Sequence, residues 1–339
     1  MIQVSNLTKQ YGDHTAVDHL SFTMESGQIH GFLGPNGAGK STTMNIITGC
    51  LSATDGSVTV CGKDIFKSPV EAKRHMGYLP EIPPLYLDMT TLEYLAFVAE
   101  AKGVEHELAY RQVKEAMELT QISDVADRLI KTLSKGYKQR VGIAQALLGS
   151  PDVIILDEPT VGLDPKQITE IRSLIRKLGE TRTVIISSHI LAEISELCDH
   201  VIIISNGKIV ADDTIEALEA SINNHGKLSL TAKCSVDIMA DILETIPSLE
   251  SYREEHTQDG YTRFVVEFSP KNDPSEEIFF AFADKRIAIT DMSHEHLTLE
   301  DIFLRLTEEG AVDDRSADTT DYTPMFGNEE ENNAEEAEE

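Results

Sequence analysis

The chain has 339 residues, of which 41% are hydrophobic and 26% are charged, and its formal net charge is -29. This composition excludes a chain that is disordered throughout, and the length predicts about two domains. The acidic balance argues against broad nucleic-acid binding, which is built on a basic face that neutralises phosphates.

The cysteines and the apolar runs indicate the redox compartment and whether the chain itself spans a membrane. Four cysteines stand far apart with no CxxC pair, which argues against a disulfide framework and a zinc site and favours a reducing compartment. The first residues lack the basic and apolar regions of a signal peptide, and apolar runs such as residues 201–205 are too short to span a bilayer. We therefore expect any membrane role to depend on another polypeptide.

The first strong feature is a glycine-rich turn between a strand and a helix. The apolar segment Ile29–Leu33 leads into GPNGAGKS, which fits GxxxxGK[ST], and a helical pattern follows at residues 42–48. Such glycines let backbone N–H groups approach a phosphate, while Lys40 adds a positive charge and Ser41 is a candidate Mg²⁺ ligand. A chance glycine-rich turn is the alternative, but it does not require this strand and this helix. The predicted phosphate-binding residues are Gly34, Pro35, Asn36, Gly37, Ala38, Gly39, Lys40, Ser41 and Thr42.

A second helix start stands at LSKGYKQR, residues 133–140. Ser134 is the predicted N-cap and Gly136 lies in the first turn, and the basic, amphipathic run behind them needs no buried partner. A helix that begins in this way leaves backbone N–H groups open, and the positive end of its dipole favours an anion. The pattern therefore indicates a second place for a negatively charged group.

Two acidic residues end the next strand. Residues 153–156 form a continuous apolar run, typical of a strand buried on both faces of a parallel sheet, and Asp157 and Glu158 follow it. Ligands of open α/β sheets bind at the carboxyl ends of the strands. Asp157 is thus a candidate Mg²⁺ ligand, directly or through water, and Glu158 a candidate for polarising the water that attacks a γ-phosphate. A solvated loop start is the alternative, although it needs no such apolar lead-in.

A third strand, residues 183–189, ends in a histidine and is followed by a helical pattern. A lone histidine is usually structural. Because His189 stands at the carboxyl end of this strand, on the ligand side of the sheet, we treat it as a candidate catalytic group.

The pattern changes after about residue 220. A strand at 227–234, a helix at 236–246, a hairpin at 249–269, a helix at 274–285 and a strand at 287–293 are expected. This β-α-β-β-α-β order predicts a small ferredoxin-like α+β domain over residues 221–308, which closes with a capped amphipathic helix at 297–309. Regulation or dimer clamping and a packing role without chemistry are equally open for it.

The last residues, 309–339, form an acidic tail. From residue 313 onward the chain has 11 acidic residues against one arginine, so this segment carries -10 of the net charge. With few apolar residues, it is predicted to be disordered and solvated. A docking arm for a basic partner is the less favoured alternative.

With these motifs in this order, residues 1–220 resemble the nucleotide-binding subunit of ATP-binding cassette (ABC) transporters, a family of P-loop NTPases. The resemblance implies an α/β fold with a mostly parallel sheet and a helical subdomain at about residues 82–148. It implies ATP and Mg²⁺ as cofactors, with Lys40, Glu158 and His189 as catalytic groups. Tyr11 falls where the family stacks an aromatic ring on adenine, and Asp164 ends a loop that looks like the one crossing the dimer interface.

LSKGY lies where the family has its signature, commonly LSGGQ. In the family this helix N-terminus caps the γ-phosphate of ATP held by a second subunit, so the resemblance implies a second ABC ATPase subunit, with a homodimer as the simpler case. Lys135 replaces the first glycine and Tyr137 the glutamine. Since Ser134 and Gly136 are retained, we expect function to survive.

A second departure from the family is Glu81, where a glutamine usually follows Tyr-Leu-Pro. Glutamate is still able to ligate Mg²⁺, but it adds a negative charge beside Asp157 and Glu158. This predicts weaker nucleotide binding or a raised carboxylate pKa.

The resemblance implies an ATPase that energises transport, by export, through separate transmembrane permease subunits at the cytoplasmic face of the membrane. The C-terminal ending resembles that of drug-export and gliding-type members. The alternative is a soluble ABC protein working on ribosomes or DNA. Such proteins tend to carry two cassettes or a long coiled coil, and this sequence has neither. The substrate stays open because specificity lies in the membrane subunits.

Overall fold

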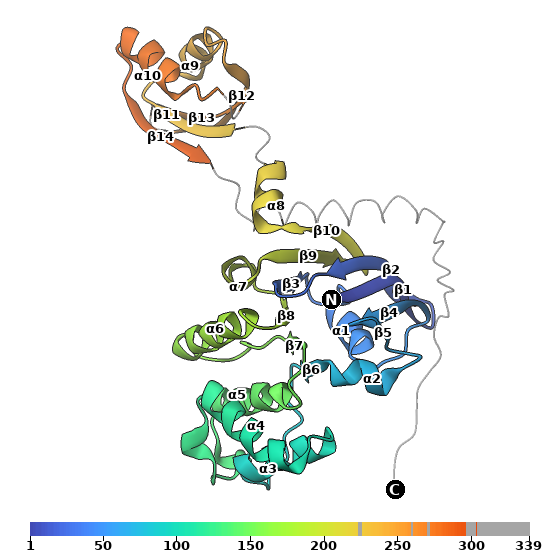
Figure 1. Cartoon of the computed structure of the whole chain (residues 1–339). Coiled ribbons are helices and arrows are strands. Elements are labelled where there is room, and N and C mark those ends of the chain that lie inside the picture. The colour runs from blue at the N-terminus through green and yellow to red at the C-terminus, as the bar shows by residue number, and fades with distance from the viewer. Residues whose placement is uncertain (223–225, 259, 270–271, 296–302, 304–339) are drawn as a thin grey trace, which may run out of the picture.

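The structure is a computed structural model that describes residues 1–222, 226–258, 260–269, 272–295 and 303 (Figure 1). The chain begins with an antiparallel sheet in the order β2-β1-β4-β5. Its strands are β1 (Ile2–Tyr11), β2 (His14–Met24), β4 (Asp55–Val60) and β5 (Lys63–Asp64). Among the described residues no helix has both the length and the hydropathy that a membrane span requires.

A six-stranded sheet forms the centre of the cassette, in the order β10-β9-β3-β8-β7-β6. Neighbouring strands are parallel except for β10, which runs antiparallel to β9. The strands are β3 (Ile29–Leu33), β6 (Met76–Leu79), β7 (Val153–Asp157), β8 (Thr183–Ser188), β9 (His200–Ser205) and β10 (Lys208–Thr214). The predicted mostly parallel sheet is therefore confirmed.

Two hydrophobic cores cover the two faces of this sheet. Along β7, Val153 and Ile155 belong to the core shared with the antiparallel sheet, whereas Ile154 and Leu156 belong to the core on the other face. This alternation explains why the sequence of β7 is a continuous apolar run. The first face carries α1 (Lys40–Ile47) and α2 (Pro69–Arg74), and the second carries α5 (Lys135–Leu147), α6 (Pro165–Gly179) and α7 (Leu191–Leu197).

The helical subdomain packs onto the second face through α5. It consists of α3 (Thr91–Ala101), α4 (His106–Leu119) and the short 3₁₀ helices η1 (Ser123–Val125) and η2 (Ile130–Thr132). The sequence suggested that α5 needs no buried partner, and this is wrong. Arg140 of α5 is buried, donates to the carbonyl oxygen of Thr120 at 3.0 Å and forms an ion pair with Glu170 of α6. That ion pair depends on a residue far along the chain, so the local pattern does not reveal it.

The C-terminal elements follow the predicted β-α-β-β-α-β order. After α8 (Ile215–Ile222), an antiparallel sheet has the order β12-β13-β11-β14. Its elements are β11 (Gly226–Ala232), α9 (Val236–Leu243), β12 (Leu249–Gln258), β13 (Tyr261–Phe268), α10 (Ser275–Asp284) and β14 (Ile289–Glu295). They enclose a third hydrophobic core around side chains such as Phe264 and Phe282. Phe303 packs against the core of the cassette, while the rest of the predicted helix at 297–309 and the acidic tail lie outside the described residues.

Candidate functional site

The phosphate-loop sequence forms the turn between β3 and α1. All of β3 is buried between β8 and β9, so the loop leaves the middle of the sheet. A Cβ at Gly34 would lie 2.4 Å from the carbonyl oxygen of Ile204, and a Cβ at Gly39 would lie 2.5 Å from that of Ala16. Gly39 also has a φ of 102°, which residues with side chains rarely adopt. Only glycines therefore let the backbone pass here, and the N-terminus of α1 faces the ligand side.

Lys40, the first residue of α1, lies inside this loop. Its Nζ donates to the carbonyl oxygens of Gly34 at 2.8 Å and of Pro35 at 3.2 Å. Burial lowers the pKa of Lys40, and the carboxylates at the end of β7 and at Glu81 oppose that shift. Within the described residues no carboxylate forms an ion pair with this ammonium group. The two carbonyl oxygens carry no full charge to balance this ammonium group. A phosphate would supply one, so the loop fits a nucleoside triphosphate.

The two carboxylates at the end of β7 point in different directions. Glu158 has a φ of 48°, in the left-handed region. Its backbone N–H donates to the backbone oxygen of Ser187 at 3.1 Å and to the Ser187 hydroxyl at 3.2 Å, and that hydroxyl donates to Asp157. This turn places Glu158 in the wall of the pocket, while Asp157 stays buried against β8. The two neighbouring acids thus occupy different positions, as their different predicted roles require.

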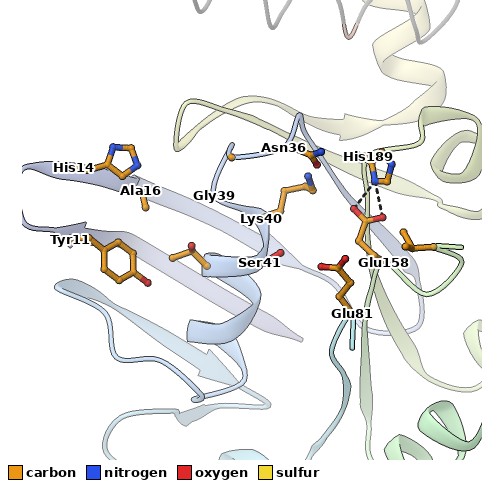
Figure 2. A pocket seen from close by; sticks show the side chains of 13 residues that line it. Tyr11, His14, Ala16, Asn36, Gly39, Lys40, Ser41, Glu81, Glu158 and His189 are labelled. Carbon is orange, nitrogen blue, oxygen red and sulfur yellow. Dashed lines mark hydrogen bonds and ion pairs between the residues drawn. The ribbon is translucent and has the colours of Figure 1, made fainter. Parts of the chain in front are cut away.

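The side chains of His189 and Glu158 are in direct contact in the wall of the pocket. Nδ1 of His189, which follows β8, lies 2.9 Å from both carboxylate oxygens of Glu158 (Figure 2). The carboxylate accepts from Nδ1–H and so leaves Nε2 of the ring available for another partner. The sequence predicted two separate catalytic candidates, and the contact between them is information that only the fold supplies.

The residues predicted to hold Mg²⁺ form a set of oxygen donors. Ser41 lies in the first turn of α1, Asp157 ends β7, and Glu81 lines the pocket after β6. Hydroxyl and carboxylate oxygens suit a hard cation such as Mg²⁺, so these residues fit the ion. When bound, the ion would neutralise phosphate charge.

The charge at Glu81 acts on Asp157. Burial raises the pKa of Asp157, and the Glu81 carboxylate raises it further. Hydrogen bonds from the hydroxyls of Ser187 and Ser41 and the positive charge of Lys40 oppose this rise. The sequence predicted that the charge of Glu81 weakens nucleotide binding or raises the pKa of a neighbouring carboxylate, and the raised pKa of Asp157 agrees with the second, with burial as the larger cause.

Lys40, Ser41, Glu81, Glu158 and His189 line one pocket of about 430 Å³, whereas the buried Asp157 lies outside its lining. Figure 2 shows Tyr11, His14 and Ala16 at one end of it and Glu81, Glu158 and His189 at the other. Tyr11 ends β1 and is 50% exposed, and the Nζ of Lys9 lies 5.0 Å from the centroid of its ring, so the ring has exposed area for a flat ligand beside that contact. His14 and Ala16 were missed in the sequence because nothing in the phosphate-loop motif says that the β1–β2 hairpin lies against it. The pocket is lined by Tyr11, His14, Ala16, Asn36, Gly37, Gly39, Lys40, Ser41, Thr42, Glu81, Glu158, Val161 and His189.

Ser134, Gly136 and Asp164 lie outside the lining of this pocket. Ser134 caps α5 by accepting from the Tyr137 N–H at 3.3 Å, so one of the N–H groups expected to be open is already bonded. Gly136 is buried against the side chain of Gln167, and Asp164 caps α6 by accepting from the Gln167 N–H at 2.9 Å. The start of α5 and the start of α6 are therefore in contact, away from the phosphate loop of their own chain.

Comparison with known proteins assigns the family. The ABC transporter family profile matches residues 17–161. The bacitracin transport ATP-binding protein BcrA of Bacillus licheniformis is 34% identical over 314 residues, which is 92% of this chain and 99% of the relative. The chain belongs to the ATP-binding subunits of ABC transporters. Nod factor export ATP-binding protein I of Burkholderia lata is 32% identical and also matches along most of its length, over 90% of this chain and 96% of the relative.

A solved ABC cassette supports the same assignment. The dimeric structure of a cassette in a post-hydrolysis state, bound to ADP and Pi, has a TM-score of 0.58 and 25% identity, and the match covers 63% of this chain and 99% of that one. The protein is thus an ABC ATPase with the P-loop NTPase fold, and such subunits dimerise and work with separate membrane permease subunits.

Proposed function

We propose that this ABC ATPase powers export, as a homodimer bound at the cytoplasmic face of a membrane through separate permease subunits. The observation that carries the proposal is the contact of His189 with Glu158 beside the phosphate loop, which places a base next to where a γ-phosphate would lie. The relatives include proteins named for bacitracin transport and for Nod factor export, which supports export as the direction.

The roles of the site residues follow from their positions. Lys40 and the loop N–H groups hold the phosphates, and Tyr11 stacks on the base. Ser41 and Asp157, with Glu81 nearby, hold Mg²⁺. Glu158 accepts hydrogen bonding from the attacking water and polarises it, while the ring of His189 orients that carboxylate and reaches the γ-phosphate through Nε2.

The homodimer is supported by the position of the signature helix. The lining of the pocket lacks Ser134 and Gly136, which lie at the start of α5, away from the phosphate loop of their own chain. An N-capped helix that begins with Lys135 and has no acidic residue in its first turn favours an anion in front of it. Two copies placed head to tail would bring this helix of one copy to the phosphates held by the other.

The surface for the permease is proposed on the helical subdomain. Around α3, several large apolar side chains are exposed, and two of their rings, those of Tyr86 and Phe97, lie 5.3 Å apart. Exposed apolar groups gathered in one region are typical of an interaction site. These side chains are Ile82, Tyr86, Leu87, Leu92 and Phe97.

The C-terminal unit is proposed to be a ferredoxin-like accessory domain over residues 221–308. Its element order and the strand order β12-β13-β11-β14 support that topology. We also propose that the protein belongs to the drug-export or gliding-type branch. BcrA supports this, because it matches 92% of this chain and its alignment therefore extends beyond the cassette into the C-terminal unit.

The test is nucleotide-dependent assembly of the Glu158→Gln variant. With ATP and Mg²⁺ this variant should sediment as a dimer. A second change, Ser134→Glu, should make the dimer dissociate, because a carboxylate in the signature repels the γ-phosphate held by the partner subunit. Thr132→Glu, on the exposed turn just before the signature, is the matched control and should leave the dimer intact.

A second experiment, on membranes, uses the same Glu158→Gln variant. Tagged Glu158→Gln protein, isolated with ATP from solubilised membranes, should copurify with a polytopic membrane protein. Recovery of ribosomes or nucleic acid alone would contradict the transport role, and a dimer that survives Ser134→Glu would contradict the composite site.

A further inference from the structure

Three potential metal ligands converge at the opposite end of β7 from the nucleotide pocket. Cys61, His75 and Asp152 each place one ligand atom so that all three atoms lie within 4.8 Å of one another. Nδ1 of His75 is 2.6 Å from Oδ2 of Asp152. Asp152 precedes β7 and Glu158 follows it, so the strand separates the two places by about 20 Å. The cluster is therefore not part of the ATP site.

The three residues come from segments that only the fold brings together. Cys61 lies in the turn between β4 and β5, His75 ends α2, and Asp152 precedes β7. Figure 1 shows α2, β5 and β6 grouped on this side of the cassette, and α2 contacts both strands. Spacing along the chain could not reveal such a cluster. The sequence argued against a zinc site because it has no CxxC pair, and that argument does not reach ligands that are far apart along the chain.

Backbone hydrogen bonds fix all three positions. The Cys61 N–H donates to the carbonyl oxygen of Met1 at 2.9 Å. The carbonyl oxygen of His75 accepts from the N–H of Val153 at 3.0 Å, and that of Asp152 accepts from Thr183 at 3.1 Å. The ligand positions are therefore tied to the residue before β1 and to β7 and β8 before any ion arrives, which lowers the conformational entropy lost on binding.

The turn that carries Cys61 is itself unusual. Cys61 has a φ of 48° and Gly62 a φ of 77°, so both central residues of this two-residue hairpin turn are left-handed. Such turns favour Asn-Gly, Asp-Gly or Gly-Gly, because a side chain at the first position is strained. A cysteine is thus held where the turn alone would select another residue.

We propose that Cys61, His75 and Asp152 bind one divalent transition-metal ion of the zinc class. A thiolate and a carboxylate balance the two positive charges of the ion, and a neutral imidazole completes a mixed sulfur, nitrogen and oxygen set that suits zinc. Ligands at about 2.0–2.3 Å from one ion are at most roughly 4.6 Å apart, so small side-chain rotations bring the three atoms into range. Cys61 and His75 are half-buried and Asp152 is exposed, which gives the ion an entry path and leaves room for water as a fourth ligand.

A bound ion would clamp the β4–β5 hairpin and α2 to the start of β7. This role does not depend on the transport function, because the ligands lie outside the nucleotide pocket. Binding to the folded state alone should stabilise the cassette.

The test is titration of the nucleotide-free protein with Co²⁺ as a spectroscopic substitute for zinc. Binding at this cluster should produce the near-ultraviolet charge-transfer absorption of a thiolate–cobalt bond, and no cysteine lines the nucleotide pocket that could mimic it. Cys61→Ser should abolish that band, and His75→Gln and Asp152→Asn should each weaken zinc affinity, measured against a chromophoric chelator, about 10-fold or more. Cys50→Ser, which removes an exposed thiol elsewhere, is the control and should bind like the wild type.

Thermal unfolding adds a second readout. Zinc should raise the melting temperature of the wild type and of Cys50→Ser but not of Cys61→Ser, whose folding is checked by circular dichroism. If Cys61→Ser does not fold, His75→Gln decides the matter through the same affinity measurement. A wild-type protein that shows no thiolate–cobalt band, or a band that survives Cys61→Ser, would overturn the proposal.

Discussion

The six-stranded sheet of the cassette and the four-stranded sheet of the C-terminal unit bury polar groups very differently. At the carboxyl edge of the cassette sheet, buried polar side chains include Lys40, Asp157, Glu158 and Ser187. In the described part of the C-terminal unit, buried polar side chains are limited to Ser229 and Thr262.

Burying a charge is unfavourable unless it is paired or used. The buried charges of the cassette lie where its sheet is expected to hold phosphates, whereas the described core of the C-terminal sheet is mainly apolar. This difference predicts that the chemistry belongs to the cassette sheet and that the C-terminal sheet has a packing or regulatory role. Each of the following changes tests one of the two sheets.

The largest effect is expected in the C-terminal core. Phe282 of α10 is fully buried, so Phe282→Ala should lower the free energy of unfolding of this unit by about 3–5 kcal/mol. Phe280 is 61% exposed, and Phe280→Ala should change stability by about 0.5 kcal/mol or less. Chemical denaturation followed by circular dichroism measures both. ATP hydrolysis by the cassette should be unchanged in Phe280→Ala, and loss of nucleotide binding in a folded Phe282→Ala protein would break the comparison.

The next effect lies in the phosphate loop. Lys40→Ala removes the one ammonium group that the loop carbonyls hold, and turnover should fall by roughly 10²–10³-fold, as for other preorganised charge-stabilising groups. Phosphate release and calorimetric titration with ATP measure the loss. Lys114→Ala, on the exposed surface of α4, is the control. Normal affinity in Lys40→Ala would mean that the buried charge serves the fold rather than the nucleotide.

The residues expected at the carboxyl edge of the sheet stand out in the sequence because the predicted chemistry requires particular residue types at fixed spacing. A phosphate approached by backbone needs glycines such as Gly34 and Gly39, and a cation needs acids at a strand end, so these residues stand out without a structure. The C-terminal unit shows the opposite case. Its strands and helices follow from periodicity, but any of many apolar residues would fill its core, and no pattern there indicates a function.

What the sequence could not show are contacts between distant segments. His14 and Ala16 enter the pocket from the β1–β2 hairpin, and Ser187 reaches Asp157 from the neighbouring strand. Arg140 belongs to the run that was expected to need no buried partner, and its ion pair with Glu170 comes from α6. Each depends on how two elements pack, which local periodicity does not encode.

A smaller effect is expected at Glu81. This residue is exposed, and an exposed charge contributes about 1 kcal/mol or less, so Glu81→Gln should change turnover by roughly fivefold or less. Burial is the main cause of the raised pKa of Asp157, and Glu81 adds to it, so removing the Glu81 charge should lower that pKa. Asp157 would then stay ionised at lower pH, and the acid side of the pH–rate profile should move to lower pH. A Glu81→Asn variant, equally neutral but shorter, should move it in the same direction, and an unmoved profile in both would show that Glu81 does not act on Asp157.

The smallest effect concerns the amino ends of the strands, where the cassette buries a titratable group that takes no part in the chemistry. His30 on β3 is buried, donates from Nε2–H to the carbonyl oxygen of Glu25 at 2.9 Å, and lies beside His200 of β9. Burial lowers the pKa of His30 below its ordinary value of 6.5. The unfolded chain therefore takes up a proton that the folded chain resists, so this contribution to stability is complete above about pH 6.5 and is lost as the pH falls below it.

His30→Gln keeps a neutral group able to bond to Glu25, and its free energy of unfolding should fall less than that of the wild type between about pH 8 and about pH 5.5. The exposed His106→Gln should show the wild-type dependence, and identical acid sensitivity in all three proteins would move the cause away from His30.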